Sequence, residues 1–170
     1  MRLIQQVLEF RKVESGNLKI CVSYGDISSF LRSCAEAFIP LLGKRRQLLS
    51  FESTPDIIFG FFDADKLDKI VYNLLSNAAK YTPEGGQICV RAALADEYTL
   101  QIDVTNTGEL MTQKTIDGLF KRFYEGDYRR HNTIGTGIGL ALVKDLVALH
   151  HGTIEAFSNE QTGNCFRIML

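Results

Sequence analysis

Two asparagines, a lysine and a tyrosine stand at helical spacing within residues 65–86, DKLDKIVYNLLSNAAKYTPEGG. The residues that share one sector of a helix with about 3.6 residues per turn are Asn73, Asn77, Lys80 and Tyr81. Asparagine is a poor residue for a helix interior, because its amide competes for backbone hydrogen bonds. An asparagine oxygen can ligate Mg²⁺, while a lysine ammonium suits a phosphate and a tyrosine ring suits a base or a ribose. The sector therefore predicts a site that binds Mg²⁺ and phosphate. The alternative is an ordinary amphipathic helix whose polar edge has no ligand.

A broad apolar face on the same helix would pack against a core and so position the polar sector. Its residues are Leu67, Ile70, Val71, Leu74, Leu75, Ala78 and Ala79. Asp63 or Asp65 is expected to start the helix, and the Pro and Gly residues of TPEGG, residues 82–86, are expected to end it. The helix is thus predicted to have one face in the core and a second face available for chemistry.

A glycine-rich segment, GTGIGL at residues 135–140, opens a strongly apolar helix that is expected to run to His150. Glycine lets backbone N–H groups approach a phosphate closely, and a helix N-terminus adds partial positive charge. Such a loop also occurs where it only packs, so a GxGxxG-type match alone is weak evidence. No regular strand directly precedes the segment and no Lys followed by Ser or Thr comes after it, which disfavours a Rossmann or P-loop nucleotide site.

The rest of the chain predicts helices and hairpins in no regular alternation. Further helices are expected at residues 2–14, 27–42 and 113–120, the second of them capped by Asp26. Strands are expected at residues 18–22, 49–52, 57–62, 87–95, 99–105, 153–158 and 164–170, with the last four forming two hairpins. Strands and helices do not alternate as in a doubly wound parallel sheet. The predicted fold class is therefore α+β, a two-layer α/β sandwich with a mixed sheet of about five strands packed on about three helices.

Composition and charge set the broad class of protein. The 170 residues are 45% hydrophobic and 23% charged, which is ordinary for one globular domain. A formal net charge of −1 gives no electrostatic argument for a nucleic-acid or membrane-surface partner. No apolar run is long enough to span a bilayer, and the first residues do not form a signal peptide. Cys21, Cys34, Cys89 and Cys165 are expected to be reduced core residues, with a disulfide or zinc site as the lesser alternative.

Four segments resemble motifs of one known family and occur in that family's order. NLLSNAAKYTPEGG, residues 73–86, resembles the N box of the sensor histidine kinases, in the ATPase superfamily shared with gyrase, heat-shock chaperones and mismatch-repair ATPases. GTGIGLALVKDLVALHHGTI, which begins at residue 135, resembles their G2 box, and LFKRFYEGD, residues 119–127, resembles their F box. LEFRKVESGNLKI, residues 8–20, resembles the junction after the second dimerisation helix. The resemblance covers almost the whole chain and implies the Bergerat ATP-binding fold.

The resemblance also implies domain boundaries and a set of ATP-binding residues. Residues 1–16 would be the C-terminal end of the second dimerisation helix with its connector, and residues 17–170 would be the catalytic ATP-binding domain. In the implied catalytic set, Asn77 ligates Mg²⁺ on the ATP phosphates, Asn73 supports it and Lys80 neutralises phosphate charge. A mobile lid would span residues 121–134, anchored by Phe120 and Phe123. The implied ATP-binding residues are Asn73, Asn77, Lys80, Tyr81, Asn106, Gly108, Met111, Phe120, Gly135, Thr136, Gly137, Ile138, Gly139 and Leu140.

The G1 box departs from the family pattern DxGxGI, in which the Asp accepts a hydrogen bond from the adenine amino group. The chain has NTGELM at residues 106–111, so Asn106 replaces the Asp and Leu110 replaces the second Gly. An amide oxygen still accepts a hydrogen bond, but a charge-assisted bond is about twice as strong as a neutral one. Glu125 also stands where many relatives have a cationic residue, and His151 where many have Gly. We therefore expect weaker adenine binding than in a typical relative.

The histidines of this chain are poor candidates for the phosphoacceptor. His131 falls in the expected lid, while His150 and His151 end the last long helix. The resemblance implies a protein-histidine kinase of a two-component system, whose acceptor His lies on a dimerisation helix absent from this chain. The implied partners are the dimerisation helices of the same or the partner subunit and the receiver domain of a response regulator. The implied location is cytoplasmic, as the cytoplasmic part of a membrane-anchored bacterial sensor.

Three other functions stay open beside the ATP-dependent phosphodonor domain. A degenerate domain that acts as a regulatory protein-interaction module would explain the substitutions at Asn106, Leu110 and Glu125. A superfamily ATPase that hydrolyses ATP is disfavoured, because the position of Asn73 commonly holds a Glu acting as base, and asparagine cannot take up a proton. A serine-directed anti-sigma kinase of the same superfamily is disfavoured by the entry segment LEFRKVESG and by the F box.

Overall fold

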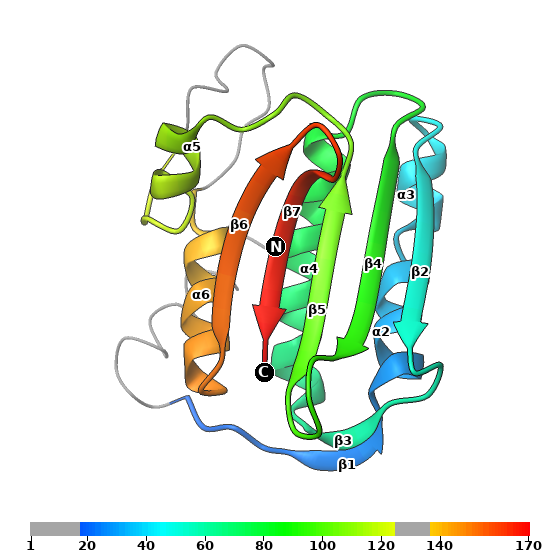
Figure 1. Ribbon diagram of the computed structural model, residues 1–170, viewed down its shortest axis with the longest axis vertical. Coiled ribbons are helices and arrows are strands. Elements are labelled where there is room, and N and C mark those ends of the chain that lie inside the picture. Colours follow the sequence, from blue (N-terminus) through cyan, green and yellow to red (C-terminus); the bar gives the residue numbers. More distant parts are fainter. Residues whose placement is uncertain (1–17, 125–136) are drawn as a thin grey trace.

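A five-stranded sheet forms one layer of the molecule, and helices α2, α4 and α6 cover one of its faces (Figure 1). The computed structural model describes residues 18–124 and 137–170. Its elements are β1 (Ser23–Asp26), α2 (Ile27–Glu36), α3 (Ile39–Gly43), β2 (Leu48–Thr54), β3 (Phe59–Phe62), α4 (Ala64–Tyr81), β4 (Gln87–Leu94), β5 (Leu100–Asn106), α5 (Gln113–Gly118), α6 (Gly139–Leu149), β6 (Thr153–Asn159) and β7 (Gly163–Met169).

The sheet is mixed, with strand order β2-β4-β5-β7-β6. β2 pairs with β4 in parallel, and the other neighbours pair antiparallel. β4–β5 and β6–β7 are the two expected hairpins. β1 and β3 form a separate two-stranded antiparallel sheet. The prediction of an α+β two-layer fold with a five-stranded mixed sheet is confirmed.

Helix α4 is the central element of the helical layer, and its sequence explains why. All seven residues of its predicted apolar face are buried, none more than 8% exposed. Asp63 is its N-cap residue, since the side chain accepts a hydrogen bond from the Lys66 N–H at 3.1 Å. The helix ends at Tyr81, and Thr82 is its C-cap residue directly before Pro83, as the sequence predicts. Its apolar face meets α2, α6 and β5, which leaves one edge free of the core.

Two expectations about the N-terminal half are wrong. Residues 18–22 are not a strand; strand β1 follows them and pairs with β3. The single helix expected over residues 27–42 is divided into α2 and α3 between Ala37 and Phe38. Pro40 explains the division, because proline lacks the N–H that a continuous helix would need there. The helix expected at residues 2–14 lies outside the described residues.

Helix α6 begins at Gly139, four residues later than expected, and Gly135 and Thr136 lie outside the described residues. His150 caps its C-terminus, and His151 follows with a φ of 59°, a conformation that glycine adopts more easily. The two histidines thus end the helix, as expected. Among the described residues, none of the helices has both the length and the apolar character that crossing a bilayer requires.

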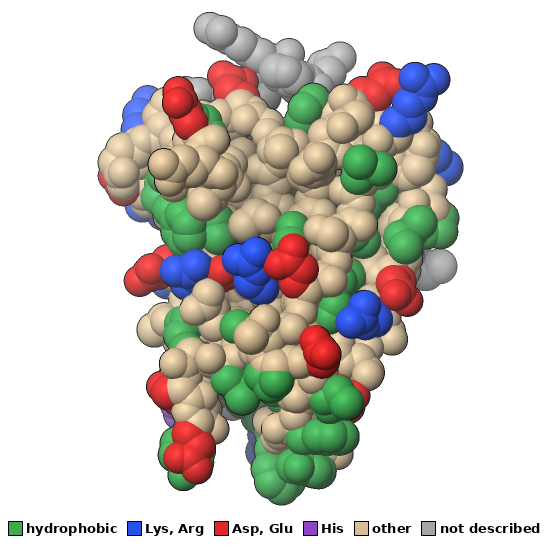
Figure 2. Space-filling model, turned by 45° about the vertical axis from the view of Figure 1, so that its right-hand side comes forward, with side chains coloured by type: hydrophobic (Ala, Val, Ile, Leu, Met, Phe, Trp, Pro, Cys, Tyr) green, Lys and Arg blue, Asp and Glu red, His purple; other side chains and the backbone are tan. Residues whose placement is uncertain are grey.

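The face of the sheet that the helices leave open carries a row of alternating acidic and basic side chains (Figure 2). In strand order the row is Glu52, Arg91, Asp103, Arg167 and Glu155. Arg91 pairs with Glu52 at 2.7 Å, and Arg167 pairs with Asp103 at 2.8 Å. These hydrogen bonds raise the pKa of both guanidinium groups. The charges of this face are therefore neutralised largely by one another.

The four cysteines are all free thiols, as expected, but they are not all in the core. Cys165 is buried, Cys34 and Cys89 are half-buried, and Cys21 is exposed. Burial raises the pKa of Cys165 to about 12, and burial together with the nearby Asp68 carboxylate raises the pKa of Cys34 to about 12. Both thiols therefore stay protonated and unreactive at neutral pH. In the part of the chain that the structure describes, no cluster of His, Cys, Asp and Glu could hold a metal ion.

Candidate nucleotide-binding site

The polar edge of α4 lies against the N-terminus of α6. Asn73 donates from Nδ2 to the Lys69 carbonyl at 2.7 Å, which directs its Oδ1 away from that carbonyl. A Cβ atom added to Gly139 would lie 2.9 Å from Asn73 Oδ1. A side chain at the start of α6 would therefore force the Asn73 amide to move from this position. The structure thus brings the segment 73–86 together with residues 137–140, the described part of the glycine-rich segment, although the two motifs begin about 60 residues apart in the sequence.

The other end of the α4 edge meets the segment that follows β5. A Cβ atom added to Gly108 would lie 2.8 Å from the Tyr81 carbonyl oxygen, so only glycine lets these backbones approach so closely. The Lys80 ammonium lies 4.8 Å from the centre of the Tyr81 ring, a cation–π contact. Asn77 is half-buried between these two ends of the edge. The four polar residues of the predicted sector are thus bordered by glycine contacts at both ends.

Two residues that the sequence analysis missed hold the last turn of α4. The buried Gln47 donates from Nε2 to the carbonyl oxygens of Ala79 at 3.0 Å and Thr82 at 2.6 Å. Arg45 donates to the Ala79 carbonyl at 2.9 Å. The last carbonyls of a helix lack partners within the helix, and a cation near them also suits the helix dipole. Gln47 and Arg45 therefore fix the turn that carries Lys80.

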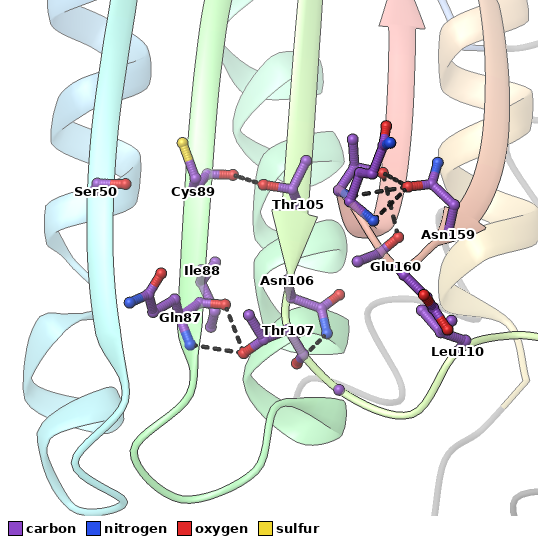
Figure 3. Close-up of a pocket in the computed structure, with 14 residues that line it drawn as sticks. Ser50, Gln87, Ile88, Cys89, Thr105, Asn106, Thr107, Leu110, Asn159 and Glu160 are labelled. Atoms are coloured by element: carbon purple, nitrogen blue, oxygen red, sulfur yellow. Dashed lines mark hydrogen bonds between the residues drawn. The ribbon is translucent and has the colours of Figure 1, made fainter.

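Asn106 occupies the end of β5 with only 5% of its surface exposed. Its Nδ2 donates to the Thr107 carbonyl at 3.0 Å, as the dashed line in Figure 3 marks. That bond gives the amide a definite orientation, with Oδ1 as the group available to accept a further hydrogen bond. The substitution of the family's Asp by Asn106 therefore preserves an acceptor at this position.

The segments at either side of the undescribed residues 125–136 contact each other. Phe123 donates its N–H to the Gly137 carbonyl at 3.0 Å, and a Cβ atom on Gly137 would lie 2.8 Å from the Phe123 Cα. The Phe123 ring itself is 71% exposed, so this contact is made by the backbone. The Phe120 ring instead packs edge-on against Phe166 of β7, with ring centres 6.4 Å apart. Phe120 therefore fastens its segment to the sheet.

The remaining predicted residues have different surroundings. Ile138, directly before α6, is 9% exposed, and Leu140 packs against the core. Met111 is half-buried, and its N–H donates to Ser158 Oγ of β6 at 2.9 Å. Ser158 is a third residue near the site that the sequence analysis missed. No local pattern could reveal it, because the two residues are 47 positions apart.

A cavity of about 460 Å³ opens on the uncovered face of the sheet (Figure 3). Ser50, Cys89 and Thr105 line it from three adjacent strands, and the turn after β6 closes one side. Figure 3 shows these side chains in front of the sheet, with α4 behind it. Residues 106–108 line one end of the cavity, and Gly108 also contacts the Tyr81 carbonyl at the end of α4. The rest of the cavity lies on the face of the sheet opposite to α4 (Figure 3).

Comparisons with known proteins agree with this geometry. A family model described as histidine kinase-, DNA gyrase B-, and HSP90-like ATPase matches residues 62–170. The histidine kinase P4 of Formosa agariphila is 32% identical over 174 residues, which cover 100% of this chain and 13% of that protein. Full-length ShkA in complex with AMPPNP has the same fold, with a TM-score of 0.88 at 24% identity over 99% of this chain and 35% of that one. The histidine kinase ThkA in complex with the response regulator TrrA has a TM-score of 0.77 at 19% identity, over 99% of this chain and 47% of that one.

The two-layer fold and the polar edge of α4 define a nucleotide-binding type of domain. The chain belongs to the histidine kinase-, DNA gyrase B-, and HSP90-like ATPase family. Three further curated relatives that match the full length of the chain are named histidine kinases, and the chain spans 11% to 28% of their length.

Proposed function

We propose that this chain is the ATP-binding phosphodonor domain of a two-component sensor histidine kinase. The observation that carries the proposal is the convergence of separate motifs on the polar edge of α4. Gly139 contacts Asn73 at one end of that edge, and Gly108 contacts the Tyr81 carbonyl at the other. Phosphoryl transfer depends on positioning and charge neutralisation more than on covalent chemistry from the protein, and this arrangement supplies both.

In this proposal each residue of the edge contacts a different part of ATP. The Oδ1 of Asn106 accepts a hydrogen bond from the adenine amino group, with Gly108 and Met111 beside the base and Tyr81 beside the ribose. Lys80 turns from the Tyr81 ring toward the phosphates. Because Ile138 and Leu140 have their side chains in the protein interior, the glycine-rich segment 135–140 binds the phosphates through backbone N–H groups.

Magnesium fits the donor chemistry of the edge, with Asn77 as its protein ligand and Asn73 in support. Mg²⁺ takes oxygen ligands, and in nucleotide enzymes one or two protein groups and the substrate phosphates complete its shell. The described residues contain no cluster of carboxylates, cysteines and histidines that would hold the ion without a nucleotide. When bound, the metal would neutralise charge on the phosphates, while Asn77 fixes where those phosphates lie.

The phosphoacceptor in this proposal is a His on a dimerisation helix outside this chain, in the same or the partner subunit. Residues 1–16 would be the end of the second dimerisation helix and its connector, and residues 17–170 the catalytic domain. The downstream partner would be the receiver domain of a response regulator; the structural neighbour ThkA is in complex with the response regulator TrrA. The domain would work in the cytoplasm, as part of a membrane-anchored bacterial sensor.

Calorimetric titration with ATP and Mg²⁺ tests the proposal, with Asn77→Ala as the variant. Binding should be saturable and Mg²⁺-dependent in the unchanged chain, and Asn77→Ala should weaken it at least about tenfold, since the metal loses its protein ligand. Ser76→Ala on the neighbouring position of α4 is the matched control and should bind as the unchanged chain does.

Two other outcomes would contradict the proposal. Absence of binding at millimolar nucleotide would favour a degenerate domain that acts through protein contacts. Steady release of inorganic phosphate by the chain alone would favour a hydrolysing ATPase, although Asn73 cannot act as a general base for water.

A further inference from the structure

A partly buried hydrogen-bond network joins β6 and β7 to the segment that follows the Asn106 position. Asn164 of β7 is 5% exposed and donates from Nδ2 to the Glu109 carbonyl at 3.0 Å. Its Oδ1 accepts a hydrogen bond from Ser158 Oγ at 2.7 Å. Ser158 Oγ in turn accepts from the Met111 N–H at 2.9 Å. We call Ser158 and Asn164 the clamp, because together they bind the carbonyl before Leu110 and the N–H after it.

The clamp completes a set of restraints on residues 106–111. Asn106 is the direct cross-strand partner of Asn164 in the β5–β7 pair. A Cβ atom on Gly163 would lie 2.5 Å from the Asn106 carbonyl oxygen, so β7 also holds the backbone of Asn106. Gly108 is held against the Tyr81 carbonyl. Without the clamp, residues 109–111 would lose the two side-chain hydrogen bonds that tie their backbone to β6 and β7.

These restraints bear on the orientation of the Asn106 amide. An asparagine amide presents an acceptor on one side and donors on the other, and rotation by about 180° exchanges them. In this structure the Thr107 carbonyl holds Nδ2 and so leaves Oδ1 as the acceptor. Thr107 is held from one side by β4, since its N–H donates to the Gln87 carbonyl at 2.9 Å. From the other side, the clamp restrains residues 109–111 and supplies Asn164, the cross-strand neighbour of Asn106. A base with an amino group suits the Oδ1 acceptor, whereas a base with a carbonyl at the same position would need the exchanged amide.

We propose that Ser158 and Asn164 are positioning residues that fix the Asn106 amide as an acceptor and thereby make the site discriminate adenine from hypoxanthine. The inference rests on the proposed function, because it takes ATP as the ligand. It assigns to the clamp a role that the carboxylate of the usual G1 box would not need. A carboxylate is an acceptor in either orientation, but an amide is selective only when its orientation is fixed.

The test compares the dissociation constants of ATP and ITP with Mg²⁺ by calorimetry, because ITP carries a carbonyl where ATP carries the amino group. The unchanged chain should bind ATP about tenfold more tightly than ITP. Ser158→Ala and Asn164→Ala should reduce that ratio to about threefold or less, mainly by weakening ATP binding. Ser158→Thr keeps the hydroxyl and should therefore keep the ATP-to-ITP affinity ratio of the unchanged chain. Thr153→Ala, at an exposed position of the same strand, is the matched control and should leave the ratio unchanged.

The ratio separates positioning from a merely structural role, since general loss of structure weakens both nucleotides equally. Circular dichroism monitors folding, and the milder Ser158→Ala carries the test if Asn164→Ala fails to fold. An unchanged ratio in Ser158→Ala, or equal affinities in the unchanged chain, overturns the inference and leaves the proposed function standing. A chain that binds neither nucleotide overturns the proposed function and the inference with it.

Discussion

At the scale of single residues, Asn106 combines a gain and a loss relative to the carboxylate that the family pattern has there. The amide donates to the Thr107 carbonyl, which a carboxylate cannot do. A carboxylate would accept a stronger, charge-assisted hydrogen bond from adenine. Compared with an aspartate, Asn106 therefore binds adenine more weakly but stabilises the ligand-free protein through its hydrogen bond to Thr107.

Asn106→Asp should separate these two effects. We expect ATP binding to become about fivefold tighter, which corresponds to about 1 kcal/mol for replacing a neutral hydrogen bond with a charge-assisted one. We also expect the ligand-free variant to melt at a lower temperature, because the carboxylate faces the Thr107 carbonyl without a donor between them. Calorimetry and thermal unfolding measure the two quantities, with Asp117→Asn as an exposed control on α5. Weaker ATP binding by Asn106→Asp would contradict this account of the base contact.

At the scale of elements, α4 depends on residues far from it in the sequence. Its C-terminal carbonyls receive hydrogen bonds from Gln47, 32 and 35 positions earlier in the chain. Since Gln47 is 5% exposed, water cannot easily replace these bonds. An unsatisfied buried carbonyl lowers stability by about 1–3 kcal/mol.

Gln47→Ala should therefore lower the free energy of unfolding by about 1–3 kcal/mol, since the Thr82 carbonyl loses its donor while the Ala79 carbonyl keeps the hydrogen bond from Arg45. Urea unfolding at neutral pH measures the change. Gln161→Ala, at an exposed position in the turn after β6, is the matched control and should change stability by less than about 0.5 kcal/mol. If both variants unfolded at the same urea concentration, Gln47 would not be holding the end of α4.

The elements that the sequence predicted are those with strong local signals. The apolar period of α4, its Asp63 cap and its Pro83 ending all lie within the helix or beside it, so its bounds and core face were predictable. The parallel pairing of β2 with β4 was not predictable, because nothing in either strand specifies a neighbour across the intervening helix. The same holds for the site. The α4 edge is visible in the sequence, but Gln47 and the clamp act through contacts that only the tertiary fold creates.

At the scale of the whole molecule, Asp63 connects the start of the described chain with α4. It is 2% exposed and accepts hydrogen bonds from the Cys21 N–H at 2.7 Å and the Lys66 N–H at 3.1 Å. The Lys66 ammonium lies 3.3 Å from the same carboxylate. Displacement of residues near Cys21 would therefore act directly on the N-terminus of the helix whose far end carries Lys80. The contribution of the Asp63 carboxylate to the stability of the whole domain should therefore depend on pH, because these contacts favour its charged form.

Asp63→Asn should reveal that influence in the pH dependence of unfolding. Burial opposes ionisation of Asp63, but the hydrogen bonds from Cys21 and Lys66 outweigh it, so its pKa in the folded protein lies below the ordinary value. A lowered folded-state pKa stabilises the protein above the unfolded pKa of about 4, and the contribution is lost as pH falls through the folded value. We expect the unchanged chain to be about 1–2 kcal/mol more stable than Asp63→Asn at pH 7, and this difference should shrink steadily below about pH 4. Urea unfolding between pH 7 and pH 3 measures it, with the exposed Asp56→Asn as control. A difference that is constant across this range would mean that the Asp63 charge does not stabilise the fold, since asparagine itself caps helices well and shares the geometry of aspartate.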